Sequence, residues 1–251
     1  MKTVQLFGYP ISAGGLQEDL RHALGLLKST EGIRYVACAN PHSIEVAERD
    51  PDFKEALLNA AILLPDGTGI ILAAKLLGGP VKEKVAGGDF FIGLCSTLQV
   101  RGGARFFFLG ATDHVLSLIS SRLAREYPAI KVCGVFSPPY KERFSDEDNR
   151  KMVEAINKAK PDVLWVGMTA PKQEKWIYQN RNLLDVPLAA AIGAVFDFYS
   201  GVKPRSSRFW VWLGLEWLPR FLREPKRLWE RNIKSTPLFL LRTFREKCRH
   251  A

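Results

Sequence analysis

The stretch ILLPDGTGIILAAKLLG, residues 62–78, contains the transition from strand to helix that decides the fold. Its start, Ile62–Leu64, is an apolar run of the kind found in a parallel strand that is covered on both faces. Pro65, Asp66 and Gly67 end that run, and an apolar stretch of helical length follows at once. Such a junction between a buried strand and a helix is typical of a βαβ unit.

The same alternation of short apolar runs with longer helical patterns continues along most of the chain. We expect strands over residues 4–7, 34–38, 62–64, 105–109, 130–135, 162–166 and 187–192. We expect helices near residues 15–28, 43–60, 68–77, 88–99, 113–126, 146–159 and 172–184. Strands that alternate with helices of this length predict an α/β fold, a mostly parallel Rossmann-like sheet flanked by helices.

The C-terminal part of the chain differs from the rest in both pattern and charge. Residues 203–251 contain helix-like segments and no strand pattern, and they hold 13 lysines and arginines against 4 acidic residues. Because the whole chain has a formal charge of +10, residues 1–202 are nearly neutral. We therefore predict an α/β domain at 1–202 and a C-terminal basic helical appendage at 203–251. The basic, tryptophan-rich appendage suits an anionic partner, either a lipid surface or a nucleic acid.

The sequence lacks the signatures of several common protein classes. No apolar stretch is long enough to span a membrane and the start of the chain has no signal-peptide core, which predicts a cytoplasmic protein. The cysteines have no metal-ligand spacing and the histidines do not cluster, so we expect free thiols and no bound metal. The complete dinucleotide-binding glycine fingerprint and the Walker, HExxH and GxSxG motifs are also absent.

Polar or glycine residues follow several of the predicted strands directly. They are Asn40, Asp66, Gly110, Gly167 and Asp197. Because ligands bind outside the carboxyl ends of the strands in open parallel sheets, we expect these residues near a pocket. Asp66 has two interpretations at this stage: it is the N-cap of the following helix, or it is an ionised carboxylate that acts as a general base.

Three other positions are candidates for the same pocket. Asn40 is either a turn residue or a side chain that binds a hydroxyl group. Lys84, in KEKVAGGD, is either a solvated charge or a lysine directed at a phosphate. The segment GMTAPKQEKWI, residues 167–177, predicts a helix start after a buried strand, with Gln173 and Glu174 on its first turn.

Four segments occur in order along the chain: CANPHSIEVAERDP, AILLPDGTGIILAAKLLGGPVKEKVAGGDFF, VGMTAPKQEKWI and GLEWLPRFLREPKRLWER. Together they resemble the WecG/TagA/CpsF family of glycosyltransferases from about residue 3 to residue 235. The resemblance implies an inverting enzyme that needs no metal and no cofactor. It would move N-acetylmannosamine or a related hexose from a UDP donor to a polyprenyl-diphosphate-linked acceptor, in the synthesis of cell-surface polysaccharide or teichoic acid.

The resemblance also implies roles for particular residues. Asp66 would be the catalytic base, and Asn40 and Gln173 would bind the substrate. Two further substrate-binding positions depart from the family pattern: Cys38 stands where a threonine is usual, and Lys84 stands where an arginine is usual. Lysine keeps the positive charge but loses the bidentate geometry of a guanidinium. The nucleotide pocket is expected at Gly110, Ala111, Tyr140, Gly167 and Asp197. Contacts with the diphosphate and the membrane are expected from Arg220, Arg227 and Arg231.

These expectations define the partners and the alternatives. The partners would be the UDP-sugar, the lipid-linked acceptor and an anionic membrane surface, with no nucleic acid, and the protein would associate peripherally with the inner face of the cell membrane. The sequence leaves open whether the protein forms a homo-oligomer. A nucleic-acid-binding protein would explain the basic appendage but leaves the polar strand ends unused. A Rossmann-like oxidoreductase would explain the alternating pattern but lacks the glycine fingerprint.

Overall fold

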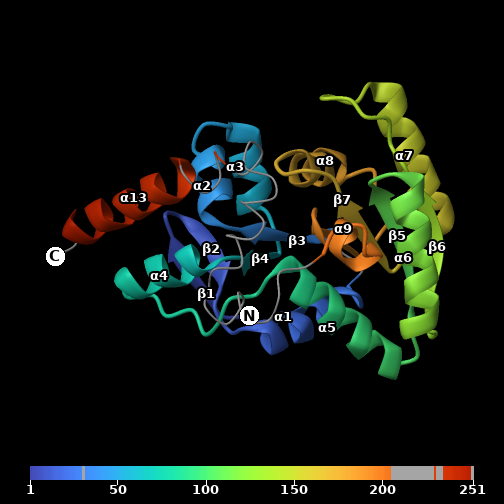
Figure 1. The fold of residues 1–251 in the computed structure, drawn as a ribbon, viewed down its shortest axis with the longest axis horizontal. Coiled ribbons are helices and arrows are strands. Elements are labelled where there is room, and N and C mark those ends of the chain that lie inside the picture. The colour runs from blue at the N-terminus through green and yellow to red at the C-terminus, as the bar shows by residue number, and fades with distance from the viewer. Residues whose placement is uncertain (30–31, 205–228, 230–233, 250–251) are drawn as a thin grey trace.

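One eight-stranded sheet runs through the molecule (Figure 1). The computed structural model describes residues 1–249 apart from 30–31, 205–228 and 230–233. The strands are β1 Thr3–Leu6, β2 Tyr9–Ser12, β3 Arg34–Ala39, β4 Ile62–Pro65, β5 Ala104–Gly110, β6 Ile130–Phe136, β7 Val163–Gly167 and β8 Leu188–Ala191. Their order is β1-β2-β4-β3-β8-β7-β5-β6, and every neighbouring pair is parallel except β1 and β2.

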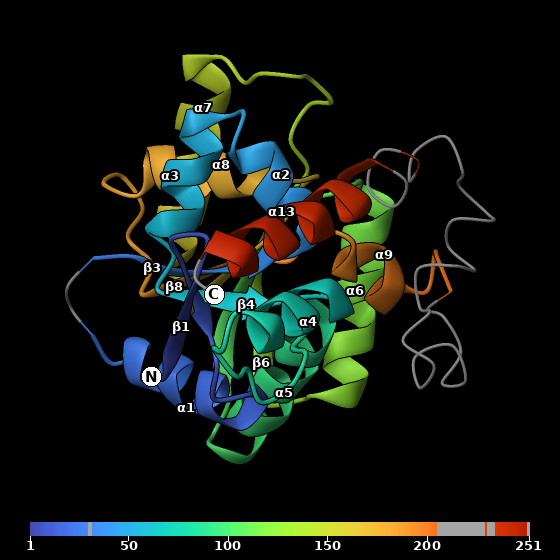
Figure 2. The same cartoon turned by 90° about the vertical axis from the view of Figure 1, so that its left-hand side faces the viewer.

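Helices cover both faces of this sheet, as Figures 1 and 2 show. They are α1 Leu16–Leu26, α2 Pro41–Ala47, α3 Pro51–Leu58, α4 Thr68–Leu76, α5 Gly87–Val100, α6 Asp113–Glu126, α7 Asp146–Ala159, α8 Lys172–Asn180, α9 Val195–Ser200 and α13 Thr236–Arg249. Phe106 and Phe108 of β5 pack with α1, α5, α6 and α9, whereas Phe107 packs with α7 and α8 on the opposite face. The predicted mostly parallel, Rossmann-like sheet flanked by helices is confirmed.

The structure differs from the expected elements at three places, one of which is the short helix α9, which was not expected. Strand β2 was not expected, because Pro10 lowers the strand signal of YPIS, yet β2 forms a hairpin with β1 and joins the parallel sheet where Ile11 pairs with Leu63. The single helix expected over 43–60 is wrong, because the chain forms α2 and α3 instead. Asp50 caps α3 by accepting a hydrogen bond from the Phe53 N–H at 3.1 Å.

The C-terminal helix α13 packs on the body of the protein between α2 and α4 (Figure 2). Phe239 is fully buried and meets the Phe7 ring edge-on at 5.4 Å between centroids. Arg242 Nη2 forms an ion pair with Glu48 Oε2 at 2.8 Å. A basic C-terminal helix is therefore confirmed, and the described part of the appendage is docked against the α/β body.

Some expectations about the whole chain are limited by the described residues. The division into 1–202 and 203–251 stays a prediction, because most of the second unit lies outside them. None of the described helices is long and apolar enough to cross a bilayer. In the same part of the chain, no three His, Cys, Asp or Glu side chains come together as a metal site requires. The four cysteines, all of which are described, form no disulfide bond.

Candidate active site

The turns that follow β3 and β4 pack against one another at the carboxyl edge of the sheet. The Asp66 N–H donates a hydrogen bond to the Ala39 carbonyl at 2.8 Å. A Cβ atom at Gly69 would lie only 2.6 Å from Cγ of Pro41, so the first turn of α4 needs glycine to approach the first turn of α2. This packing brings Asp66 and Asn40 to the same place on the edge of the sheet.

The structure decides how helix α4 is capped. Gly67, with a φ of 131°, occupies the N-cap position, and glycine has no side chain that could accept a hydrogen bond from the first turn. The interpretation of Asp66 as the N-cap is therefore wrong. Its half-buried carboxylate follows the fully buried strand β4 at the edge where ligands bind in such sheets. Its role as a general base stays a prediction.

Asn40 is the N-cap of α2 in a reciprocal capping arrangement. Its Oδ1 accepts a hydrogen bond from the Ser43 N–H at 3.0 Å, and its own N–H donates to Ser43 Oγ at 2.7 Å. Asn40 thus has a structural role at the start of α2, and hydroxyl binding by its side chain stays a prediction. Because Oδ1 serves the helix, the amide nitrogen is the part of this side chain suited to donate a hydrogen bond to a ligand.

The loop that carries Lys84 crosses the ends of β2 and β4. The Lys82 N–H donates to the Ala13 carbonyl at 3.0 Å, and the Val85 N–H donates to the Pro65 carbonyl at 3.0 Å. Lys84 is half-buried between these two anchor points. The backbone at Lys84 is therefore held beside the end of β4, and contact of its side chain with a phosphate stays a prediction.

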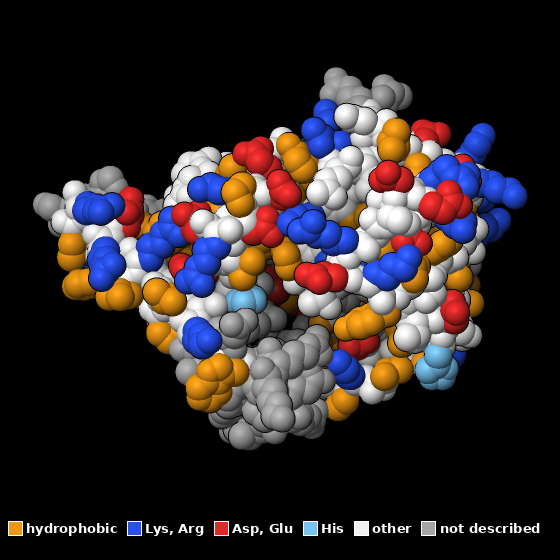
Figure 3. Space-filling view, turned by 90° about the horizontal axis from the view of Figure 1, so that it is seen from above, with side chains coloured by type: hydrophobic (Ala, Val, Ile, Leu, Met, Phe, Trp, Pro, Cys, Tyr) orange, Lys and Arg blue, Asp and Glu red, His pale blue; other side chains and the backbone are white. Residues whose placement is uncertain are grey.

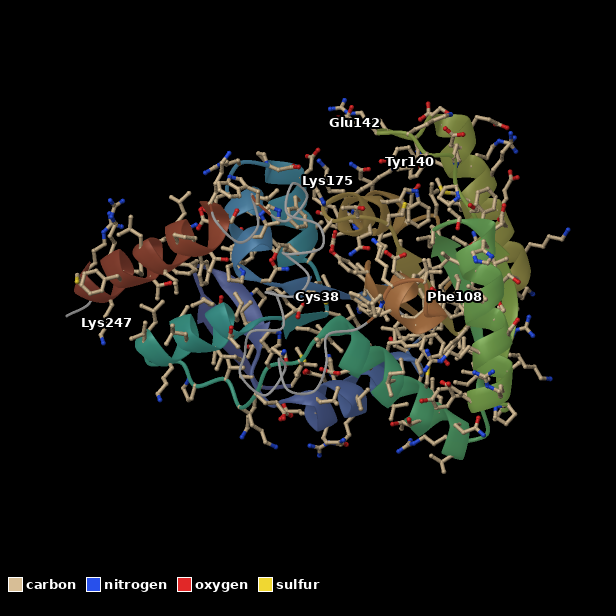
Figure 4. All side chains as sticks on the ribbon, viewed as in Figure 1. Cys38, Phe108, Tyr140, Glu142, Lys175 and Lys247 are labelled. Carbon is tan, nitrogen blue, oxygen red and sulfur yellow. The ribbon has the colours of Figure 1, made fainter. Side chains whose placement is uncertain are left out.

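Cys38 lies on β3 near the middle of the sheet, between the two halves of the molecule (Figure 4). Its Sγ is 4.0 Å from the Ala191 carbonyl oxygen of β8. A Cβ atom at Gly87, the first residue of α5, would lie 3.3 Å from the same sulfur. The side chain at this position therefore sets how closely the start of α5 approaches the carboxyl edge.

Gln173 and Glu174 form a buried polar pair on the first turn of α8. They are 4% and 2% exposed, and Gln173 Nε2 donates a hydrogen bond to Glu174 Oε1 at 2.8 Å. Burial raises the pKa of the Glu174 carboxyl to about 7, although the hydrogen bond from Gln173 opposes the rise. The Gln173 amide lies against Gly193, just beyond β8. The pair is thus placed at the carboxyl edge beside β7 and β8.

The glycines at the ends of β5 and β7 approach each other closely. Gly110 pairs with Gly167 in the sheet, and a Cβ atom at Gly110 would lie 2.6 Å from the Gly167 carbonyl oxygen. Ala111 follows with a φ of 60°. Packing alone explains these glycines, because a Cβ atom at Gly167 would overlap the ring of Phe196. Nucleotide binding by Gly110, Ala111 and Gly167 stays a prediction.

The roles of the other predicted nucleotide-binding and anion-binding residues stay predictions. Tyr140 is fully exposed after β6 and lies far from Cys38 in Figure 4. Asp197, on α9, forms an ion pair with Lys203 at 3.0 Å. The three arginines expected at the diphosphate and the membrane, Arg220, Arg227 and Arg231, lie outside the described residues.

Sequence reasoning did not single out Asp19, on α1. Ser12, the last residue of β2, donates a hydrogen bond to Asp19 Oδ1. Asp19 Oδ2 is buried and has no partner among the described residues. Burial raises the pKa of this carboxyl to about 6, and the Ser12 bond opposes that rise. The sequence did carry a sign that Asp19 is buried, because its position places it on the same helix face as the buried residues Leu20 and Ala23.

The side chains at the carboxyl edge of the sheet are those of an enzyme site. A carboxylate, an amide, a lysine and a buried Gln–Glu pair gather at the carboxyl edge of a parallel sheet, where α/β enzymes bind polar ligands. On the face shown in Figure 3, basic side chains alternate with acidic ones, and a hollow opens near its centre. These features indicate an α/β enzyme for a polar substrate.

Comparison with known proteins identifies the family. The sequence matches the glycosyl transferase WecG/TagA/CpsF family over residues 4–251. A protein of Bacillus spizizenii is 32% identical over 82% of this chain and 77% of its own length, and one of Bacillus subtilis is 30% identical over 84% and 79%. One of Staphylococcus aureus is 27% identical over 85% and 80%. All three are named N-acetylglucosaminyldiphosphoundecaprenol N-acetyl-beta-D-mannosaminyltransferase. The chain belongs to the WecG/TagA/CpsF family and is a glycosyltransferase.

Proposed function

We propose that this protein transfers N-acetylmannosamine or a related hexose from a UDP donor to N-acetylglucosamine linked to a polyprenyl diphosphate. The names of the three relatives support this acceptor and this sugar. The observation that carries the proposal is the packing of the β3 and β4 turns, which brings Asp66 and Asn40 together at the carboxyl edge. A base and a polar side chain that can orient a sugar are thereby held side by side.

The proposed reaction is a single displacement that inverts the configuration at the sugar's C1. The Asp66 carboxylate takes the proton of the acceptor hydroxyl, and the acceptor oxygen forms a bond to C1 from the face opposite UDP. The bond between C1 and the β-phosphate oxygen breaks, and UDP leaves with the electron pair. A positioned general base contributes about 10² to 10⁴ in rate.

We propose further that no metal ion is needed to stabilise the leaving diphosphate. Lys84, held beside the end of β4, supplies one positive charge at this edge. Arg220, Arg227 and Arg231 are the proposed remaining cations. Charge-assisted hydrogen bonds from such side chains are about twice as strong as neutral ones, and they can replace a divalent ion at a diphosphate.

The function is tested with purified protein and a panel of UDP-hexoses, with lipid-diphosphate-linked N-acetylglucosamine as acceptor and EDTA present in a parallel series. Transfer of N-acetylmannosamine that survives EDTA would support the proposal. Asp66→Asn should retain UDP binding and lose about 10²-fold or more in turnover. Near-normal turnover of Asp66→Asn would show that Asp66 is not the catalytic base.

We also propose that α13 forms part of a membrane-binding surface. Its outer face exposes Leu238, Leu241 and Phe244, while its opposite face packs on the body through Phe239. Apolar side chains gather at the outer end of this helix in Figure 3, with basic side chains beside them. An exposed apolar strip flanked by lysine and arginine is typical of helices that lie in the membrane interface.

This surface is tested by sedimentation with vesicles. Binding should be stronger to vesicles with anionic lipid than to neutral ones and should weaken with salt, because a basic residue near an anionic surface contributes about 1 kcal/mol. The double variant Leu241→Ser/Phe244→Ser should bind less, since both side chains are exposed and their loss spares the core. Binding to RNA in place of vesicles would support a nucleic-acid-binding protein instead.

A further inference from the structure

The Gln173–Glu174 pair contains two buried oxygens that the fold itself does not satisfy. Gln173 Oε1 and Glu174 Oε2 are both buried, and neither has a hydrogen-bond partner among the described residues. A buried acceptor without a donor costs about 1–3 kcal/mol. Since native proteins pair almost all such atoms, an unpaired amide oxygen at a ligand-binding edge needs a functional explanation.

The contacts of the amide determine which of its ends is available. The nitrogen of Gln173 is engaged, because Nε2 donates to Glu174 Oε1 at 2.8 Å. Glu174 is an acceptor at that oxygen when it is ionised, and also when its proton is on Oε2. Nε2 uses one of its two N–H groups in this bond, whereas Oε1 has no partner among the described residues. The oxygen is therefore the end of the amide with no bond at all, and an amide oxygen accepts hydrogen bonds but donates none.

Gly193 restricts the amide from the other side. Its φ is +47°, and a Cβ atom there would lie 3.3 Å from Gln173 Oε1 and 3.4 Å from Nε2. The amide group therefore lies against a position that carries no side chain. The Gln173 side chain is thus held between Gly193 on one side and the Glu174 carboxyl on the other. A group that recognises a ligand must be held in this way before the ligand binds.

We propose that Glu174 is a positioning residue that turns the Gln173 amide oxygen toward the sugar of the donor, so that this position recognises a hydrogen-bond donor, either a hydroxyl or an N-acetyl N–H. This inference rests on the proposed function. An anionic substituent of the sugar at the same place would lie against the Gln173 amide oxygen, which donates no hydrogen bond, and near the Glu174 carboxyl. The pair therefore selects a neutral hexose over a hexuronic acid at the group it contacts.

The test uses Glu174→Leu in the full-length protein. We expect the affinity for UDP-hexose, measured by titration calorimetry, to fall between about 2-fold and 12-fold, the range that one net hydrogen bond corresponds to. Affinity for UDP alone should not change, and KM for the donor should rise more than kcat falls. Thermal stability should change little, because the substitution removes a buried carboxyl oxygen that has no partner among the described residues but also removes the acceptor of Gln173 Nε2.

Two further variants separate positioning from a purely structural role. In a Gln173→Leu background, Glu174→Leu should produce no further loss of UDP-hexose affinity, because Glu174 acts through the amide. Asn180→Leu is the matched control: Asn180 is buried on the same helix and donates to the Trp176 carbonyl at 2.9 Å, so its loss should lower stability and spare donor affinity.

Several results would overturn the inference. An equal loss of affinity for UDP would place the pair at the nucleotide, and additive losses in the double variant would show that Glu174 acts apart from Gln173. Unchanged donor affinity in Glu174→Leu would also refute it. If the wild-type protein binds UDP-hexose but transfers no sugar to the lipid-linked acceptor, the proposed function fails, while the affinity measurements still test the positioning role.

Discussion

The buried carboxyl of Asp19 makes the stability of this protein depend on pH in a direction that the structure fixes. Its side chain is fully buried, and Ser12 is its hydrogen-bond partner. Burial raises the pKa in the folded state from 3.8 to about 6. The ionised carboxylate is consequently less favourable in the folded chain than in the unfolded chain, so folding is most favoured when Asp19 is protonated.

The size of the effect follows from the two pKa values. One pKa unit corresponds to about 1.4 kcal/mol, so the destabilisation approaches about 3 kcal/mol above pH 6 and vanishes well below pH 3.8. Between pH 4.5 and pH 7 the contribution of Asp19 to the free energy of unfolding should fall by about 2 kcal/mol. Asp19→Asn removes this titration and keeps an oxygen that can accept from Ser12.

Urea unfolding of the wild-type protein and Asp19→Asn at both pH values measures the effect. The stability of the variant relative to wild type should improve by about 2 kcal/mol from pH 4.5 to pH 7. Comparing the two pH values cancels any constant cost of the new amide nitrogen. Ser12→Ala should enlarge the pH dependence, because the Ser12 bond lowers the pKa of Asp19. A relative stability that is the same at both pH values would refute the reasoning.

Two other substitutions test the site and the docking of the appendage. Lys84→Arg should bind UDP more tightly than wild type and Lys84→Ala more weakly in calorimetry, because a guanidinium can grip a diphosphate with two hydrogen bonds; equal affinities for all three proteins would show that this side chain does not reach the diphosphate. Phe239→Ala should lower the free energy of unfolding by about 3–5 kcal/mol, because the ring is fully buried against Phe7. Wild-type stability in urea unfolding would contradict the docking of α13 on the body.

The sequence predicted the parallel sheet because buried strands covered on both faces leave long apolar runs, such as FFFL in β5. It did not predict β2, whose proline weakens the local pattern and whose place depends on a pairing with β4, more than 50 residues later in the chain. It also joined α2 and α3, although Asp50 and Pro51 are a cap and a first helical residue. Local sequence patterns thus predicted the strands that are buried on both faces. The place of β2 depends instead on a pairing with a strand far along the chain.

The candidate site shows the same limit at the level of single atoms. In the sequence PDGTG, either Asp66 or Gly67 can begin the helix, and helix propensity alone does not choose between them. The choice is made by tertiary packing, because Gly69 must lie against Pro41 of the neighbouring turn, and the helix then begins after Gly67. A shift of one residue in the cap decides whether Asp66 is the N-cap of the helix, while its role as a base stays a proposal. The position of Asp66 at the carboxyl edge was therefore predictable from the sequence, but the capping of α4 became known only when the packing of two turns far apart in the chain was known.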